Sequence, residues 1–546
     1  MRAFAELFKN LDASNATGDK IAALISYFQA TPATDAVAAL KILSGAKQKR
    51  VINATDLKRL ISEAAKLPNW LVEDCYAQVG DLAETCTLLC ARGSDSSNTP
   101  ALHHWTNTLI PALAKQAAPA RDQAVLLYWQ TLHPAQAFIF NKMLTGALRV
   151  GVAQGLIVRA LAGLTGLPID LMAHRLTGGV PASETEFIAL LAASDSAFDP
   201  QRPYPFFLAS ALADASSINA AELTAQLGDA ADWQAEWKWD GIRAQLIRRA
   251  GHTMIWSRGE ERMDGRFPEL ETAAKSLPDG CVLDGEILAW QTGSDRPADF
   301  TLLQKRIGKL KPGAKLLSEA PVRFLAYDLL EFEGADIRSH ALTDRRAQLA
   351  QVLKSQADTR IALSQALVFG DFDALAALRL QARSAGVEGL MLKRSSSTYQ
   401  QGRRRGDWWK WKLDPLTIDA VMIYAQAGHG KRANLYTDYT FALWHNGALV
   451  TIAKAYSGLR DAEIAELDRW IKHNTRERFG PVRAVNAEQV FELGFEAINA
   501  SARHKSGVAL RFPRILRWRR DKRAEQADQL STLQDLAMGL RADVEG

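Results

Sequence analysis

Apolar residues recur at helical intervals through the first part of the chain. Phe4, Leu7, Phe8 and Leu11 lie three or four positions apart, and similar spacing continues to about residue 200. Because this spacing places apolar side chains on one face of a helix, residues 1–200 are predicted to form an all-helical domain. The polar segment 93–100, rich in serine and ending in proline, is the clearest loop.

The pattern changes to short alternating runs beyond a proline cluster at positions 200, 203 and 205, which is typical of a domain boundary. In the second domain, 201–414, the expected strands cover residues 244–248, 253–256, 281–289, 322–330 and 389–393. Helical patterns separate them at 268–277, 343–355 and 373–386. This combination predicts an α+β domain.

A second change follows Asp414-Pro415, where we expect a hinge. Alternating patterns predict strands at 419–424, 439–444 and 449–455, and residues 461–473 have a helical pattern. Short strands with one helix are typical of an OB-fold β-barrel, which we predict for residues 415–546. Three domains also agree with the length of 546 residues.

Composition limits the class of protein. At 47% hydrophobic and 23% charged residues, the chain resembles an ordinary globular protein. It has no apolar run long enough for a membrane span and no signal-peptide pattern, so we expect a cytoplasmic protein without a membrane partner. The four cysteines lack paired spacing, which favours free thiols over a zinc site. The net charge is only +5, but residues 501–523 hold nine Lys and Arg and one acid.

The segment Glu236-Trp237-Lys238-Trp239-Asp240-Gly241 carries the strongest chemical signal. Alternation predicts Glu236, Lys238 and Asp240 on one face of a strand, with Gly241 opening a turn. One amine with two carboxylates would be costly to bury unpaired. A solvated strand face is therefore the alternative interpretation of this motif taken by itself.

Five further segments place charged or aromatic residues on or beside expected strands: Ser257-Arg258-Gly259-Glu260, Asp284-Gly285-Glu286, 324–330, 387–393 and 408–412. Each alone is more typical of a turn or a solvated face than of a catalytic site. Together they supply a nucleophilic amine, carboxylates suited to Mg²⁺, cations for phosphates and an aromatic ring for a base. The basic segment 511–522 could grip nucleic acid or orient a pyrophosphate.

In this order, the segments resemble the nucleotidyltransferase motifs of the ATP-dependent DNA ligases, and the resemblance covers nearly the whole chain. The stretch 145–151, Thr-Gly-Ala-Leu-Arg-Val-Gly, is similar to the helical DNA-binding domain of archaeal and eukaryotic members. The composition suggests a bacterial member. The resemblance implies ATP as AMP donor, Mg²⁺ as cofactor, nicked double-stranded DNA as partner, a monomer at the bacterial nucleoid, and nick sealing through a lysyl-AMP intermediate in DNA repair.

The resemblance also implies a role for each matching residue. Lys238 would be the catalytic residue that carries AMP, and Glu286 and Glu388 would bind Mg²⁺. The residues implied to bind the nucleotide are Glu236, Arg243, Arg258, Glu286, Tyr327, Arg404, Lys410, Lys412, Arg511, Arg514, Asp521 and Lys522. Tyr327 would stack on adenine, with Phe324 as the alternative. Arg403 and Arg405 are alternatives to Arg404, because the three are adjacent.

Other functions remain open on the sequence alone. An RNA ligase or a capping guanylyltransferase shares the lysine chemistry, but a helical domain of 200 residues favours duplex DNA. An NAD-dependent ligase would need a nicotinamide-reading domain and a four-cysteine module, and neither is visible. A DNA-binding scaffold without activity is disfavoured because every expected catalytic position holds a chemically competent residue.

Overall fold

The computed structural model describes all residues except 15, 46–47, 95–98, 147, 149–151, 178, 193–200, 213–217, 357, 429–434, 481 and 546. The chain forms two compact units. Unit 1 comprises Met1–Leu164, Pro181–Ile188 and Pro415–Arg541, and unit 2 comprises Thr165–Val180, Ala189–Asp414 and Ala542–Gly546. The chain passes from unit 2 to unit 1 between Asp414 and Pro415, where we expect the hinge. The hinge motion and the domain limits stay predictions.

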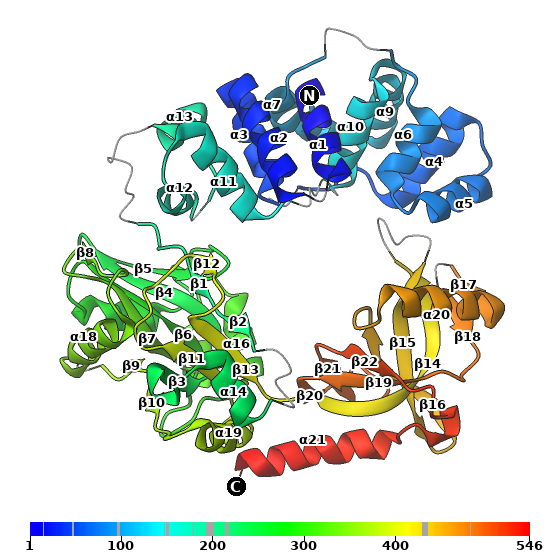
Figure 1. Cartoon of the computed structure of the whole chain (residues 1–546). Helices are drawn as coiled ribbons and strands as arrows, with labels where there is room; N and C mark the ends of the chain where they lie inside the picture. Colours follow the sequence, from blue (N-terminus) through cyan, green and yellow to red (C-terminus); the bar gives the residue numbers. More distant parts are fainter. Residues whose placement is uncertain are drawn as a thin grey trace. The chain divides into compact units, whose positions relative to one another are not determined.

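The N-terminal region is helical, as its apolar spacing predicted (Figure 1). Its helices are α1 (Arg2–Ala13), α2 (Thr17–Ala30), α3 (Ala33–Leu43), α4 (Ala54–Ala65), α5 (Asn69–Val79), α6 (Leu82–Cys90), α7 (Leu102–His104), a π-helical turn (Trp105–Leu109), α8 (Ile110–Lys115), α9 (Ala118–Thr131), α10 (Pro134–Thr145), α11 (Gln154–Thr165), α12 (Ile169–Leu176) and α13 (Glu184–Leu191). The rings of Trp105, Tyr128 and Phe140 pack edge to face at 4.9–5.3 Å in its core. No described helix is long and apolar enough to cross a membrane.

Helix α10 ends where the sequence places glycine. Gly146 adopts a left-handed conformation with φ 65°, and its N–H bonds to carbonyls in the last turn. Lys142, in the last turn of this helix, forms an ion pair with Asp81. Arg149 and Gly151, which contribute to the resemblance, lie outside the described residues.

Unit 2 is built on two main sheets. In the first, the strand order is β10-β3-β11-β13-β2, and in the second it is β5-β4-β6-β7-β8 with β9 beside β7. The strands are β1 (Phe207–Leu208), β2 (Ser210–Ala211), β3 (Trp233–Trp237), β4 (Ile242–Arg249), β5 (His252–Ser257), β6 (Cys281–Ala289), β7 (Val322–Phe332), β8 (Ala335–Asp336), β9 (Ile361–Leu363), β10 (Ala366–Leu367), β11 (Gly389–Arg394), β12 (Gly402–Arg403) and β13 (Trp408–Lys412). All five strands predicted for this domain are present.

Helices cover one face of each sheet of unit 2. They are α14 (Ala220–Leu227), α15 (Pro268–Ala273), α16 (Phe300–Ile307), α17 (Ala314–Glu319), α18 (Leu342–Lys354) and α19 (Phe372–Gln381). On the first sheet, Ala235, Leu392 and Trp411 belong to the core formed with α14 and α19. Because side chains alternate along a strand, the neighbouring polar residues Glu236, Lys393 and Lys410 face the other way.

The prediction of one strand running through Asp240 is wrong, because β3 ends at Trp237. Gly241 shows why the chain leaves the first sheet after β3 and passes close to β6. A Cβ atom at this position would lie 2.3 Å from the carbonyl oxygen of Ile287 on β6, so only glycine permits this close approach. Glu236 is also 1% exposed rather than on a solvated face.

The C-terminal part of unit 1 is a β-rich domain with one helix between strands, as predicted. The sheet runs β16-β15-β14-β18-β17, and β19 pairs with both β14 and β22. The elements are β14 (Leu416–Ala427), β15 (Tyr436–His445), β16 (Ala448–Ala455), α20 (Asp461–His473), β17 (Thr475–Phe479), β18 (Val482–Val485), β19 (Val490–Phe495), β20 (Ala497–Ala500), β21 (Val508–Arg511), β22 (Arg514–Trp518) and α21 (Leu530–Glu545). The predicted fold class is confirmed, and the four cysteines are free thiols.

Candidate active site

Lys238 lies directly after β3 and is paired with the start of β11. Its N–H donates to the Gly389 carbonyl at 2.8 Å, and its carbonyl accepts from the Glu388 N–H at 2.9 Å. This pairing brings the Lys238 ammonium into a hydrogen-bonded ion pair with the Glu388 carboxylate. Lys412 Nζ lies 3.3 Å from the same carboxylate. Burial alone would raise the pKa of Glu388, but the charges of the two lysines lower it.

Several cations surround this ion pair. Lys410 and Lys412 alternate on β13. Partial burial lowers the pKa of Lys410, and the positive charges of Arg403, Lys238, Lys412 and Arg258 lower it further. The structure therefore brings the predicted residues Lys238, Arg258, Lys410 and Lys412 into one electropositive site, which is suited to an anionic group such as a phosphate.

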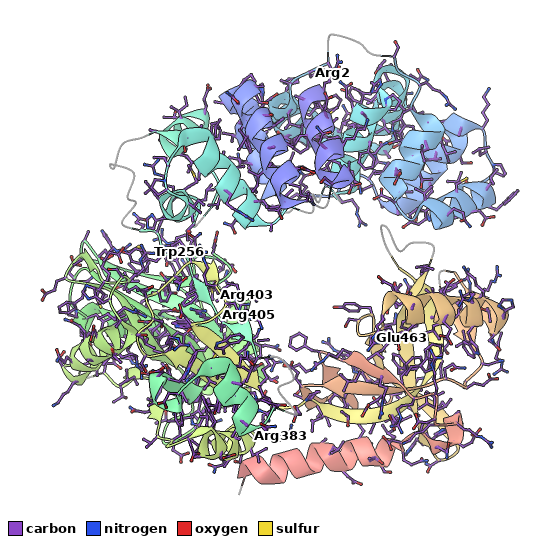
Figure 2. All side chains as sticks on the ribbon, viewed as in Figure 1. Arg2, Trp256, Arg383, Arg403, Arg405 and Glu463 are labelled. Carbon is purple, nitrogen blue, oxygen red and sulfur yellow. The ribbon has the colours of Figure 1, made fainter. Side chains whose placement is uncertain are left out.

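The adjacent arginines 403–405 differ in their surroundings. All three are exposed, and Figure 2 labels Arg403 and Arg405. Arg403 belongs to β12, which pairs with β1, and its charge acts on Lys410. The Arg405 guanidinium lies 5.5 Å from the Trp409 ring. The role of Arg404 stays a prediction. Of the three arginines, its neighbour Arg403 is the one whose charge lowers the pKa of Lys410.

Arg243 is held by a buried carboxylate. Its Nη2 and Nε donate to Asp284 at 2.7 and 3.2 Å, and its Nη1 donates to the Phe207 carbonyl at 2.7 Å. Tyr399 also donates to Asp284 at 2.7 Å. These contacts tie β4 and β6 to the segment around β1. The predicted contact of Arg243 with a nucleotide stays a prediction, because most of its donors are already engaged.

Glu286 lies two residues beyond Asp284 on β6, within the strand expected at 281–289. Burial raises the pKa of its carboxyl to about 8, although the charges of Lys238 and Arg243 act to lower it and those of Asp284 and Asp240 to raise it. Glu286 therefore shares the electrostatic environment of Lys238. The raised pKa favours the protonated form of Glu286 in the ligand-free protein, and a bound cation would favour its ionised form.

Lys393 is a site residue to which the sequence analysis assigned no role. Its Nζ lies 2.8 Å from Oε1 of the buried Glu236, 4.2 Å from the Tyr327 ring centroid and 4.7 Å from the Trp408 ring centroid. Ser364 donates a further hydrogen bond to Glu236 at 3.0 Å. The sequence did contain one indication of a buried role, because Lys393 follows the apolar residues 390–392 of an expected strand. The partner could not be found from spacing, because Glu236 is 157 residues away.

The two candidate aromatic residues occupy different environments. Phe324 is fully buried in the core of the second sheet. Tyr327 is 9% exposed and lies beside Lys393 and Arg243. Of the two rings, Tyr327 is therefore the one placed among the polar site residues.

The four predicted residues of the basic segment belong to unit 1. Arg511 ends β21, with its guanidinium 5.2 Å from the Phe512 ring, and Arg514 begins β22, 3.7 Å from Glu496. Asp521 and Lys522 follow β22 in a turn where Asp521 pairs with Arg519, and Lys522 pairs with Asp419. Hydrogen bonds from Arg519 lower the pKa of Asp521 to about 2.

The carboxylates of unit 2 can be compared with the needs of a magnesium ion. Among the described residues, no group of three or more His, Cys, Asp or Glu side chains is placed to hold a metal. Mg²⁺ is commonly bound by one or two carboxylates together with substrate phosphates and water. Glu286 and Glu388, both linked electrostatically to Lys238, fit that limited protein contribution.

Comparison with known proteins gives a consistent family. Residues 1–162 match the model "DNA ligase N terminus", 211–412 match "ATP dependent DNA ligase domain", and 432–522 match "ATP dependent DNA ligase C terminal region". A protein of Koribacter versatilis named "Probable DNA ligase" is 32% identical over 98% of this chain and 96% of its own length. The chain belongs to the ATP-dependent DNA ligase family.

Further similarities agree with a ligase of this family. A "Probable DNA ligase" of Opitutus terrae is 31% identical over 98% of this chain, which spans 62% of that protein. The solved structure titled "Pmar-Lig_Pre." aligns with 94% of this chain and 99% of its own, with a TM-score of 0.61 and 15% identity, which shows a shared fold. The enzyme class predicted from the sequence is confirmed at the level of the family. The roles of individual residues stay predictions.

Proposed function

We propose that this ligase seals nicks in duplex DNA through a lysyl-AMP intermediate on Lys238. The observation that carries the proposal is the position of the Lys238 amine, which contacts Glu388 and lies among the cations Lys410, Lys412 and Arg258. An amine nucleophile beside a phosphate-binding set of cations fits attack on a nucleotide phosphate.

In the first step, Nζ of Lys238 gives a proton to water and forms a bond to the α-phosphorus of ATP. The bond from that phosphorus to the bridging oxygen breaks, and pyrophosphate leaves with the electron pair. Lys410 and Lys412 would neutralise the charge that develops on the phosphate oxygens. Tyr327 would stack on adenine, and Glu236 would face the base. Mg²⁺, held by Glu388 and Glu286, would supply further charge neutralisation when bound.

In the later steps, AMP passes to the 5′-phosphate at a nick, and Lys238 regains its free amine. The 3′-hydroxyl then bonds to that phosphorus, and AMP leaves. The helical domain would hold the duplex through phosphate contacts that do not depend on sequence. Rotation about Asp414-Pro415 would present the C-terminal domain to the site in the first step and to DNA afterwards.

The test is to incubate the purified protein with Mg²⁺ and ATP labelled in the α-phosphate, separate it under denaturing conditions, and chase with nicked duplex DNA. We expect a covalent label that leaves the protein only when nicked DNA is added. Lys238→Ala should take no label while its affinity for nicked DNA is unchanged. Lys315→Ala is the control, because the Lys315 side chain is 89% exposed and lies outside the site.

Other outcomes would redirect the assignment. A label that persists through the chase would indicate an RNA or cap-like acceptor. A label formed with GTP or NAD but not with ATP would contradict the cofactor, and a labelled Lys238→Ala protein would contradict the nucleophile.

We also propose that the enzyme acts in DNA repair. Cells lacking it should replicate normally but lose viability after treatment that nicks DNA. Arrest of replication in untreated cells would contradict this function.

A further inference from the structure

Asp419 is a buried carboxylate that joins two basic side chains of the C-terminal domain. It lies on β14 with 6% exposure. Its Oδ2 accepts from Arg519 Nη1 at 2.7 Å and from Lys522 Nζ at 2.6 Å. Its other oxygen, Oδ1, is buried without a hydrogen-bond partner among the described residues. One carboxylate oxygen therefore holds two cations that lie three residues apart.

The turn after β22 is organised around the same contacts. Arg519 donates from Nε and Nη2 to Asp521 at 3.0 and 2.7 Å, and its backbone N–H bonds to the Val490 carbonyl at 2.8 Å. The Lys522 N–H closes the turn on the Arg519 carbonyl at 3.1 Å. As a result, Asp521 and Lys522 reach the surface from a fixed backbone, with side chains 63% and 28% exposed.

The backbone of Asp419 is held independently of its carboxylate. Its N–H bonds to the Asp528 carboxylate at 2.8 Å, and its carbonyl accepts the Asp528 N–H at 2.9 Å. An asparagine at position 419 keeps both bonds and nearly the same volume. It removes the charge that attracts Arg519 and Lys522, so the two cations repel each other and their side chains lose the shared anchor, while the backbone hydrogen bonds of the turn remain.

We infer that Asp419 is a positioning residue for lysine adenylation: it orients the cation Lys522 toward the leaving pyrophosphate and holds Arg519, which in turn fixes Asp521 in the same turn. This inference rests on the proposed function. In that step the α-phosphorus to oxygen bond breaks and pyrophosphate carries away the charge, so oriented cations lower the barrier. Sealing of a nick that already carries AMP releases no pyrophosphate. Loss of Asp419 therefore slows the first step and spares the last.

The experiment compares Asp419→Asn with the wild type in two single-turnover assays on the full-length protein. One follows labelling by α-labelled ATP over a range of ATP concentrations, and the other follows sealing of a pre-adenylated nick. We expect labelling to slow by tenfold or more, and sealing to stay within about twofold. Asp419→Glu, which retains a carboxylate, should recover part of the labelling rate.

Asp468→Asn provides a matched control. Asp468 is another buried carboxylate of this domain, 3% exposed, bound to Lys472 at 2.7 Å and to the Tyr436 N–H at 3.1 Å. Its substitution should leave the ratio of the two rates unchanged. Equal slowing of both steps by Asp419→Asn would assign the carboxylate to the fold alone and overturn the inference, as would no slowing of either step.

A second variant keeps the inference testable if Asp419→Asn unfolds. Lys522→Met should reproduce the selective loss of labelling in a folded protein, and a fully active Lys522→Met enzyme would overturn the inference. The proposed function fails separately. If the wild-type protein takes no label from ATP, the lysyl-AMP mechanism is wrong, whereas equal labelling of wild type and Asp419→Asn refutes the role of Asp419 alone.

Discussion

Replacement of Lys393 by methionine tests how the inner face of the first sheet is held together. Lys393 and Glu236 form an ion pair of 2.8 Å in which both side chains are 2% exposed. Methionine fills similar space without a charge and leaves the Glu236 carboxylate buried. Burial alone would raise the pKa of Glu236, and the charges of Lys393 and Arg346 lower it. The variant therefore loses the main favourable charge near Glu236.

The magnitude follows from the partners that remain. Removing one member of a buried pair usually costs about 3–5 kcal/mol. Glu236 keeps Ser364 at 3.0 Å, Gln234 at 2.8 Å and the Arg346 guanidinium at 3.6 Å, which places the expected loss at the lower end. For a unit of this size, about 3 kcal/mol corresponds to a fall in Tm of about 6–12 °C.

The assay is calorimetric unfolding of the full-length protein. Unfolding of a multidomain chain is not a single transition. The transition of unit 2 is identified in the wild type as the one that rises when Lys238 is adenylated. Lys315→Met, at an exposed position, is the control and should shift that transition by less than about 1 °C.

The double variant Glu236→Gln, Lys393→Met separates the lost ion pair from lost packing. Because it leaves no unpaired buried charge, its Tm should lie above that of Lys393→Met. The reasoning fails if Lys393→Met shifts the transition by less than about 2 °C, or if the double variant falls by the sum of the two single losses.

Two further perturbations follow from unit 2. The pKa of Glu286 is raised from its ordinary 4.5 to about 8, so the folded state binds this proton more tightly than the unfolded state, and wild-type stability should fall as pH rises between these values. Glu286→Gln should remove this part of the dependence of the free energy of unfolding on pH. If the free energies of unfolding of variant and wild type change in parallel from about pH 5 to about pH 8, the shifted pKa is contradicted. Gly241→Ala should lower the Tm of unit 2 and slow labelling, because its Cβ would meet the Ile287 carbonyl at 2.3 Å, whereas Gly308→Ala, with nothing within 4 Å, should change neither. Normal labelling by a stable Gly241→Ala protein would refute the close approach.

The sequence predicted the secondary-structure elements more accurately than the side-chain contacts between them. Strand β6 was found over its full length because a short, mostly apolar run that follows the turn residues 278–280 marks a buried strand locally. The pairing of Glu236 with Lys393 depends on the register of β3 against β11, which tertiary structure sets. Asp284 and Glu286 were both placed on or beside an expected strand, but the contact of Asp284 with Arg243 required the register of β4 against β6.

Helices also differed in how clearly the sequence predicted them. α18 and α20 have clear apolar periodicity and were predicted to within a residue or two. α16 and α21 were not predicted. In α16 two basic residues occupy the last turn, and one of them, Arg306, is fully buried against Glu269 rather than exposed. A charged residue in the core breaks the simple pattern on which the sequence interpretation depends.

The contact between Lys238 and Glu388 makes the resting site partly self-neutralised. While Lys238 carries no AMP, its ammonium group is paired with Glu388, the carboxylate that we propose binds Mg²⁺. Transfer of AMP onto Lys238 would convert the ammonium into an uncharged phosphoramidate nitrogen, so Glu388 would lose one of its two lysine partners at the moment when a nucleotide phosphate arrives beside it. Adenylation of the lysine would thus leave Glu388 with less positive charge beside it, so that the carboxylate could balance a bound cation in the next step.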